Sequence, residues 1–353
     1  MKAVLRLWSR RIIPWLLVVL CLSGCAGLGV EPLPLRDPSV DLAWPPPPNQ
    51  PRVRFLREIA GPGQIVPQQG RLGQLWQMVT GEERVSIPFL TPYGIAGDGG
   101  SFLCAADSSA RVVQCYDLNR REVHYLYQTG GGPLASPVGV AFDADGNVLV
   151  SDSVNAGVYV FSPQGQYLRQ LGEGEVTFQR PAGIAVAGNG DVYVVDVLAH
   201  KLKRFDRRGR YLGDFPREGS GEPLSLPSNV AVDRAGDVYI TDSMNFTVKK
   251  YDRDGNYLRS FGEIGDGPGS FARPRGVAVD SDLHVYVVDA TFDNFQIFDQ
   301  DGKLLLFVGK HGRGPGEFYL PSGIYIDKQD RIFVADTFNK RILIFEYLGQ
   351  GKQ

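Results

Sequence analysis

Short runs of alternating apolar and polar residues follow one another from Pro92 to the end of the chain, and they recur with a period of about 46 residues. Each repeat holds four such runs, separated by turns that carry Gly, Asp or Asn, the residues that tight hairpins favour. In the fourth repeat the runs fall near 229–233, 237–241, 248–252 and 257–261. The pattern predicts four-stranded antiparallel units, and an all-β sequence with this period is typical of a propeller.

A fixed spacing runs through six copies of the unit. Each copy begins with Pro-x-Gly, or with Pro-x-Asn in the fourth, and an aspartate follows the proline by 15 residues every time. The prolines are Pro92, Pro137, Pro181, Pro227, Pro274 and Pro321, and the aspartates are Asp107, Asp152, Asp196, Asp242, Asp289 and Asp336. We expect each carboxylate to accept backbone N–H bonds within its own turn; six carboxylates that converge on a cation are the alternative.

The sixth unit ends after its third strand, near Arg341–Tyr347, and the N-terminal side offers a replacement. Arg52–Ile59 resembles the fourth strands of other units, such as Tyr167–Leu171 and Tyr257–Phe261. We therefore expect residues 52–353 to form an all-β, six-bladed propeller in which this N-terminal strand completes the last blade. The two ends of the chain then close the ring and leave only short sheet edges.

Several short segments resemble the signature pieces of the NHL-repeat family, whose members build six-bladed propellers. They are Asp242-Ser-Met-Asn245, Asp336-Thr-Phe-Asn339, Gly267-Pro-Gly-Ser-Phe271 and Gly314-Pro-Gly-Glu-Phe318. The resemblance covers about 260 residues and implies an NHL-type propeller. It implies no single function, because members of the family bind proteins, bind RNA or act as enzymes.

The start of the chain resembles a bacterial lipoprotein signal. Basic residues precede an apolar run at 12–22, and Leu22-Ser-Gly-Cys25 follows. The layout predicts a signal peptide over 1–24. The resemblance implies lipidation of Cys25 and, because Ala26 follows the cysteine, a lipid anchor in the outer membrane that faces the periplasm. An ordinary signal peptide with an incidental cysteine is the alternative.

Composition adds a tether and argues against one class of partner. Eight prolines fall between Glu31 and Arg52, so we expect residues 25–51 to be an extended, proline-rich tether. The chain has 37 basic and 39 acidic residues; four of the basic ones lie in the first 24 residues, which leaves 33 against 39, a net charge of −6. Proteins that bind phosphate backbones are typically basic, so we expect no nucleic-acid partner.

An insertion precedes the first repeat, because 30 residues lie between Gly61 and Pro92. Within it, apolar residues recur at helical spacing and Gly81 follows at a plausible helix end: Leu72, Leu75, Trp76 and Val79. The spacing predicts one short amphipathic helix before blade 1. Two roles are open for it: cover for apolar surface on the rim, or a lid over the channel.

The repeat is broken on one face of the predicted propeller. The loop that leads into strand 1 and the turn between strands 2 and 3 lie together on this face, around the mouth of the central channel, and we call it the channel-mouth face. Asn229 stands where five copies have glycine, Arg275 occupies the variable position of Pro-x-Gly, and Phe292 and Asp293 alter the turn of the fifth copy. Together with Tyr93 they are the predicted ligand or partner surface; drift in a tolerant loop is the alternative.

Candidate catalytic chemistry is sparse. The four histidines fall at four different places in the repeat, so they predict no zinc ring. The first inner strand reads Tyr93-Gly-Ile-Ala-Gly97, without the acidic residue of calcium-dependent propeller lactonases. We therefore predict a non-catalytic, envelope-tethered propeller that binds or scaffolds a protein partner and has no cofactor. The alternative is a lactonase- or lyase-like periplasmic enzyme with Ca or Zn in the central channel.

Two cysteines remain once the predicted signal is removed and Cys25 is lipidated. An even number of cysteines in an oxidising compartment favours a disulfide. If Asp107 faces Val112 across its hairpin, Cys104 faces Cys115, and directly opposed residues lie within disulfide range. We predict a Cys104–Cys115 disulfide; two buried thiols that fill a blade interface are the alternative.

Overall fold

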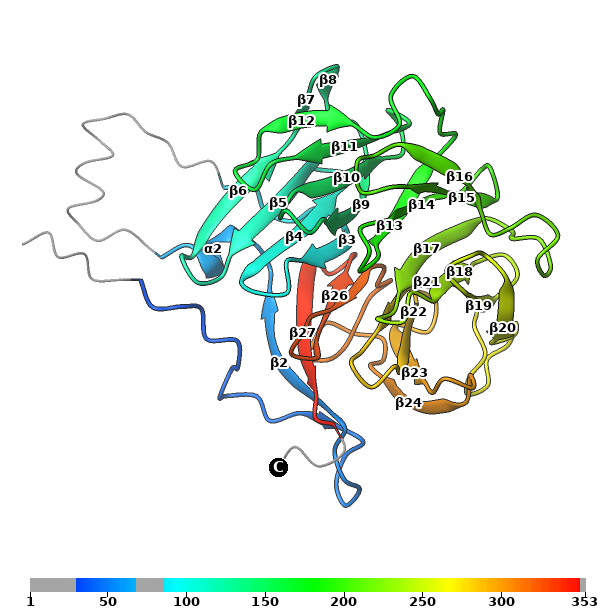
Figure 1. Ribbon diagram of the computed structural model, residues 1–353. Coiled ribbons are helices and arrows are strands. Elements are labelled where there is room, and N and C mark those ends of the chain that lie inside the picture. The colour runs from blue at the N-terminus through cyan, green and yellow to red at the C-terminus, as the bar shows by residue number, and fades with distance from the viewer. Residues whose placement is uncertain (1–29, 68–85, 350–353) are drawn as a thin grey trace, which may run out of the picture. The chain divides into compact units, whose positions relative to one another are not determined.

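The computed structural model describes residues 30–67 and 86–349. Within them, nearly all regular structure is β (Figure 1). The strands form six sheets of four or five strands, together with one small two-stranded hairpin. The sheets belong to a compact unit that begins at Leu33. They are the blades of a six-bladed β-propeller, which confirms the fold class predicted from the repeat.

The first three blades follow one another along the chain, and each is a four-stranded antiparallel sheet. Blade 1 consists of β3 (Pro92–Gly97), β4 (Phe102–Asp107), β5 (Val112–Asp117) and β6 (Glu122–Leu126). The hairpin β7 (Gln128–Thr129) and β8 (Gly132–Pro133) precedes blade 2, which consists of β9 (Pro137–Phe142), β10 (Val148–Asp152), β11 (Gly157–Phe161) and β12 (Tyr167–Gln170). Blade 3 consists of β13 (Pro181–Val186), β14 (Val192–Asp196), β15 (Lys201–Phe205) and β16 (Tyr211–Phe215).

Blades 4 and 5 follow the same plan as the first three, whereas blade 6 combines strands from the N-terminal and C-terminal parts of the chain. Blade 4 consists of β17 (Pro227–Val232), β18 (Val238–Asp242), β19 (Thr247–Tyr251) and β20 (Tyr257–Phe261). Blade 5 consists of β21 (Pro274–Val279), β22 (Val285–Asp289), β23 (Asn294–Phe298) and β24 (Leu304–Val308). Blade 6 consists of β25 (Ile324–Ile326), β26 (Arg331–Asp336), β27 (Arg341–Tyr347), β2 (Val53–Ile59) and β1 (Ala43–Trp44).

The first strand of every blade surrounds the axis, and these inner strands contact one another in a closed cycle, β3, β9, β13, β17, β21, β25 and back to β3. The repeated glycine makes this close approach feasible. A Cβ atom added to Gly94 would lie 2.3 Å from the carbonyl oxygen of Val138, and one added to Gly323 would lie 2.2 Å from that of Tyr93. A side chain does not fit at these two positions, and five of the six inner strands have glycine where they meet the next blade.

The repeated aspartate joins two segments on the channel-mouth face. The carboxylate of Asp152 accepts N–H bonds from Val154 and Asn155 in its own turn, as the sequence predicts. It also accepts bonds from the N–H groups of Ala135 and Ser136, in the loop before strand 1. The equivalent carboxylates of blades 1 and 5 are bonded in the same manner. In these three blades the buried carboxylate thus fixes the loop into strand 1 against the turn after strand 2.

Apolar side chains pack between blades rather than in one central core. Within the described part of the chain, the buried apolar residues form six clusters, each drawn from two adjacent blades. The cluster between blade 6 and blade 1 contains Ile59 and Ile344 on one side and Leu103 and Tyr116 on the other. The first and last blades are therefore joined by the same kind of contact as every other neighbouring pair.

The outer strand of blade 6 comes from the N-terminal side. β2 pairs antiparallel with β27, in the place expected for Arg52–Ile59, and the two strands lie side by side in Figure 1. The ring of Phe55 packs edge-on against that of Phe345, with 5.6 Å between centroids, and Trp44 of β1 reaches the same ring at 5.7 Å. The closing pair of strands is thus held by aromatic contacts as well as by the ladder.

Part of the segment predicted as a tether packs on the propeller. Leu33 is buried and its N–H donates to the carbonyl oxygen of Leu118 at 2.9 Å. Val40, Leu42 and Trp44 pack against the cluster between blades 5 and 6. Residues from Leu33 to Trp44 therefore lie against the blades in the structure.

Other sequence predictions lie outside the described residues. These are the signal over 1–24, Cys25 with residues 26–29, and the amphipathic helix at Leu72, Leu75, Trp76 and Val79. In the described part of the insertion, the helix is the single turn α2 (Pro62–Ile65).

Truncation of Phe55 tests the contribution of the closing strand. Phe55 is 2% exposed, so Phe55→Ala should lower the free energy of unfolding by about 3–5 kcal/mol through lost burial and a residual cavity. Phe307→Ala is the matched control, because Phe307 lies on the outer strand of blade 5 and is 55% exposed; it should change stability by about 0.5 kcal/mol or less. Urea denaturation measures both, and equal losses for the two variants would contradict the account of closure.

Candidate functional site

A cavity of about 260 Å³ lies between the inner strands. Each blade contributes one aliphatic side chain at the position after the repeated glycine or asparagine: Ile95, Val140, Ile184, Val230, Val277 and Ile324. The polar side chains among the described lining residues are Tyr93, Ser228, Asn229 and Tyr325. Burial raises the pKa of Tyr325, so this phenol is protonated at neutral pH. The wall of the channel therefore combines aliphatic side chains with polar side chains and backbone groups, in about equal share.

Asn229 takes the place of the repeated glycine at the axis, and the strand register is the same as in other blades. In blade 4, Pro227 faces Asp242 and Val230 faces Ile240, just as Pro181 faces Asp196 and Ile184 faces Val194 in blade 3. A Cβ atom on Gly183 would lie 2.7 Å from the Cα of Asn229, so this asparagine lies against the bare backbone of blade 3. Its Oδ1 accepts the N–H of Val230 at 2.7 Å. Asn229 thereby places an amide in the wall of the cavity.

Arg275 and Tyr93 meet although 182 residues separate them in the chain. The guanidinium of Arg275 donates from Nη1 to the hydroxyl of Tyr93 and lies over its ring, 5.7 Å from the centroid. Arg275 starts the inner strand of blade 5 and Tyr93 that of blade 1. The pair therefore bridges the mouth of the channel across blade 6.

A pair of hydroxyl groups in blade 4 holds the strand that carries Arg275. Ser243 Oγ lies 2.8 Å from Ser228 Oγ and donates to the carbonyl oxygen of Pro274 at 2.9 Å. Ser228 Oγ donates to the carbonyl oxygen of Arg275 at 3.1 Å. These bonds cross from blade 4 to blade 5 and fix the backbone beneath the guanidinium.

Blade 6 holds Tyr93 with an equivalent pair. Ser322 Oγ and Thr337 Oγ1 are 2.6 Å apart. Thr337 donates to the carbonyl oxygen of Pro92 at 2.8 Å, and Ser322 to that of Tyr93 at 3.2 Å. Both partners of the Arg275–Tyr93 contact are therefore held by hydroxyl groups of the preceding blade.

Asp293 and Phe292 lie elsewhere in the turn of blade 5, outside the lining of the cavity. Asp293 is buried and has a left-handed φ of 51°. Its carboxylate accepts the N–H of Leu320 at 2.6 Å and lies 2.7 Å from Nδ1 of His311. Half-buried Phe292 donates its N–H to Asp289. The structure thus brings Tyr93, Arg275 and Asn229 to the channel mouth, whereas Asp293 links blade 5 to blade 6.

Acidic side chains of the described residues form no metal cluster: no group of three or more His, Cys, Asp or Glu in that part of the chain is arranged to hold an ion. The repeated aspartates are occupied by the bonds that build the turns. Burial raises the pKa of Asp336, opposed by the N–H of Tyr319 and by the side chains of Arg341 and Asn339.

Sequence reasoning missed a second feature of the channel-mouth face. Two residues after the repeated aspartate, four blades carry an apolar side chain that is about half exposed or more. These four residues, which we call the apolar turn residues, are Val154 (69% exposed), Leu198 (47%), Met244 (55%) and Phe338 (55%). The signal was available, because the variable position of Asp-Ser-x-Asn is apolar in these copies and polar in the copies with Ser109 and Thr291.

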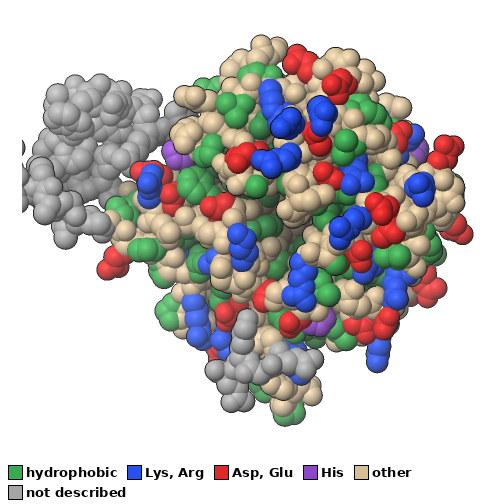
Figure 2. All heavy atoms as spheres, viewed as in Figure 1, with side chains coloured by type: hydrophobic (Ala, Val, Ile, Leu, Met, Phe, Trp, Pro, Cys, Tyr) green, Lys and Arg blue, Asp and Glu red, His purple; other side chains and the backbone are tan. Residues whose placement is uncertain are grey.

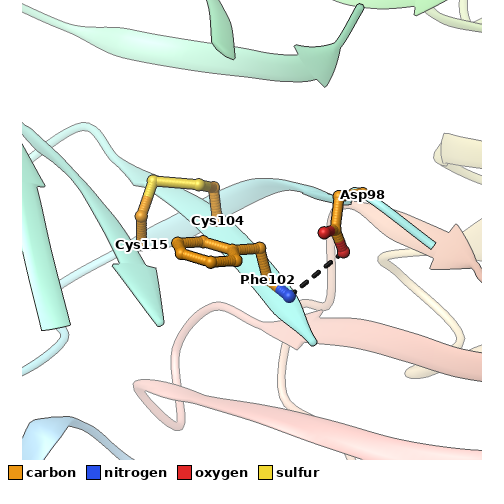
Figure 3. Close-up of a disulfide and its surroundings, with 4 residues drawn as sticks. All are labelled: Asp98, Phe102, Cys104 and Cys115. Carbon is orange, nitrogen blue, oxygen red and sulfur yellow. Dashed lines mark hydrogen bonds between the residues drawn. A yellow bond between two sulfur atoms is a disulfide. The ribbon is translucent and has the colours of Figure 1, made fainter. Parts of the chain in front are cut away.

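The predicted cysteine pair lies in the second and third strands of blade 1. Cys104 faces Cys115 in the register of β4 and β5, their Cα atoms are 4.0 Å apart, and a disulfide joins them. Figure 3 shows the bridge beside Phe102, whose N–H donates to Asp98 at 3.1 Å. Both cysteines belong to the cluster between blades 1 and 2. The disulfide therefore links the two strands of the hairpin covalently at an interface between blades.

The same register holds in blades 3 and 4. Tyr193 is opposite Arg204, whose guanidinium lies 5.6 Å from the ring centroid. Tyr239 is opposite Lys250, whose Nζ lies 5.0 Å from the ring. The position of the cysteine pair in blade 1 is thus filled by aromatic–cation pairs in blades 3 and 4.

Comparison with known proteins supports a six-bladed propeller. A family model described as a 6-bladed beta-propeller matches residues 280–351. No curated protein sequence matches the chain.

Among solved structures, the chain is similar to a virginiamycin B lyase from Staphylococcus aureus, with a TM-score of 0.51 and 17% identity over 73% of this chain and 95% of that one. It is similar to a gluconolactonase from Xanthomonas campestris, with a TM-score of 0.57 and 18% identity over 74% and 89%. An auxiliary nutrient binding protein from Bacteroides thetaiotaomicron gives 0.58 and 15% over 73% and 69%. At these identities the likeness shows the shared fold alone.

Mass spectrometry of unreduced protein tests the cysteine pair. After alkylation, protein taken from the cell envelope should carry no label on Cys104 or Cys115, because the two thiols are joined. The bridge spans 11 residues, so its reduction should lower stability modestly, by about 1–3 kcal/mol. Two alkylated cysteines at these positions in unreduced material would overturn the prediction.

Proposed function

We propose that this chain is a non-catalytic, NHL-type propeller, tethered in the bacterial cell envelope, that binds or scaffolds a protein partner on its channel-mouth face. The observation that carries the proposal is the exposure of the four apolar turn residues on one face. Exposed apolar side chains that share a face mark interaction surfaces. In blades 2, 4 and 6 the repeated carboxylate accepts a bond from its own turn, through the backbone or through the asparagine side chain. These bonds order the turns before a partner arrives, which lowers the entropic cost of binding.

The channel supports binding more than chemistry. Every blade contributes an aliphatic side chain to its wall, and Arg275 and Tyr93 are already engaged with each other at the mouth. The alternative function, a lactonase- or lyase-like enzyme with Ca or Zn in the channel, is favoured by the similarity to propellers with those activities. That similarity is one of fold, and metal analysis of the purified protein distinguishes the two: stoichiometric Ca or Zn would favour the enzyme.

The location rests on the sequence and is part of the proposal. Basic residues, an apolar run and Cys25 favour removal of residues 1–24 and a lipid anchor in the outer membrane, on the periplasmic side. A disulfide in blade 1 suits an oxidising compartment. Among the described residues, no helix is long and apolar enough to cross a bilayer.

Surface charge favours a protein partner over nucleic acid. Figure 2 shows Lys and Arg interspersed with Asp and Glu over the visible face. A chain with 37 basic and 39 acidic residues lacks the basic excess that phosphate neutralisation requires.

Cys25→Ala tests the anchor. The variant should move from the membrane fraction to the soluble periplasmic fraction, because the acyl chains that hold the protein on the bilayer are lost. Cys21→Ala is the matched control, since Cys21 lies in the segment that is removed, and it should stay with the membrane. Cell fractionation and the intact mass of the mature chain measure the result. A Cys25→Ala variant that still pellets, with no acyl mass on the wild type, would contradict the anchor.

Replacement of the apolar turn residues tests the binding face. Changing Val154, Leu198, Met244 and Phe338 to Ser should reduce capture of the partner at least about tenfold after mild crosslinking in native membranes, because the truncated side chains carry interface energy. The partner is identified by mass spectrometry and its binding repeated with purified protein.

The matched control uses four outer-strand leucines of similar exposure, Leu168, Leu212, Leu258 and Leu305. Their change to Ser should leave capture intact, and circular dichroism should show both variants folded. Loss of capture in the outer-strand variant alone, or equal capture by both variants, would place the binding surface elsewhere.

A further inference from the structure

We propose that the channel mouth binds a carboxylate with an apolar tail. Arg275 and Tyr93 hold the carboxylate, and the aliphatic side chains that line the channel contact the tail. The inference rests on the proposed function in taking the channel-mouth face as the binding face, and it adds the chemistry of what binds there.

Arg275 is half-buried, and its guanidinium contacts the phenol of Tyr93 rather than a carboxylate. The ion pairs between described residues join other arginines to acids, such as Arg204 to Asp191 and Arg341 to Asp336, and none of them involves Arg275. Arg275 instead donates one bond to Tyr93 and stacks on its ring. A guanidinium has five N–H donors in a planar fork, so most of them remain for a ligand, and a carboxylate matches that fork.

The two hydroxyl pairs indicate that this arrangement is built rather than incidental. They combine the variable residue of Pro-x-Gly with the residue after the repeated aspartate. In blade 2 these positions hold Val138 and Ser153, and in blade 3 they hold Ala182 and Val197. Blades 4 and 6 hold two hydroxyl residues each, and these are the blades that precede Arg275 and Tyr93. A feature that merely builds a blade would recur in every blade.

The channel provides room for an apolar tail directly beside the pair. Tyr93 belongs both to the pair and to the lining of the cavity. A cavity of roughly 150 Å³ suffices for a benzene-sized group. The volume of about 260 Å³ therefore accommodates a short aliphatic chain or one or two apolar side chains. Asn229 and Ser228 also line this cavity.

Two sources supply this chemistry. One is a free aliphatic acid. The other is the C-terminal carboxylate of a protein chain that ends in apolar residues, which would connect the site to the proposed partner. Hexanoate represents the first source and acetyl-Val-Leu with a free C-terminus represents the second. Hexanamide and acetyl-Val-Leu amide are the matched neutral probes, equal in tail and without the charge.

Calorimetric titration of the purified chain with these probes tests the proposal. At least one acid should bind, and its amide should bind about 10- to 100-fold more weakly, as expected for loss of a charge-assisted hydrogen bond. Arg275→Gln should weaken binding of the acid by the same factor. Arg275→Lys should weaken it by less, because lysine keeps the positive charge but lacks the paired N–H donors of the guanidinium. Arg273→Gln, an exposed arginine two residues earlier, should leave the affinity unchanged. Melting temperatures establish that the variants are folded.

Tighter binding of hexanoate would assign the site to free acids, and tighter binding of the dipeptide to a protein C-terminus. The proposal is overturned if neither acid binds, if acid and amide bind equally, or if Arg275→Gln binds like the wild type.

The test is separable from that of the proposed function. Partner capture that depends on the apolar turn residues, with no carboxylate binding, would support the proposed function and contradict the carboxylate site. Carboxylate binding that depends on Arg275, without a captured partner, would support the carboxylate site and contradict the proposed function.

Discussion

The hydrogen bonds that one buried aspartate accepts in each blade organise the channel-mouth face. A carboxylate such as Asp152 accepts backbone N–H groups from the turn after strand 2 and from the loop before strand 1. These two segments carry the variable positions of the repeat. One position holds Met244 and its equivalents, and the other holds Tyr93 and Arg275. The scaffold therefore keeps the backbone constant at the points where the side chains differ from blade to blade.

Close packing around the axis imposes the second constraint. Glycine occupies five of the six positions where one inner strand meets the next, because a Cβ there would collide with the neighbouring backbone. In blade 4, Asn229 takes this position with the strand register unchanged, and it lies in the wall of the cavity. The ring closes because β2 pairs with β27, so that blade 6 has its outer strand and both of its interfaces are filled. The channel mouth depends on this closure, because the Arg275–Tyr93 contact spans blade 6.

Periodic features of the fold were predictable from sequence, and contacts across the ring were not. The spacing from proline to aspartate predicts the blades, and one hairpin register places Cys104 opposite Cys115. The meeting of Arg275 with Tyr93 depends on the angle between blades and on the direction of two side chains, which no local pattern records. Asp293 looked like a deviation open to ligands, yet it is used by Leu320 of the next blade. Residues near Leu33 and Val40 pack on the blades without any periodic signal, so a tether was expected there.

The most direct test of the central claim, that the channel-mouth face binds a protein partner, compares two positions in the same blade. A photocrosslinking residue is placed at Met244, in the turn of blade 4, or at Leu258, on the outer strand of that blade; the two side chains are 55% and 46% exposed. Crosslinking is carried out in intact cells and the adducts are identified by mass spectrometry. The account predicts a discrete adduct with one protein from position 244 and none from position 258. Adducts from position 258 with none from position 244 would contradict it.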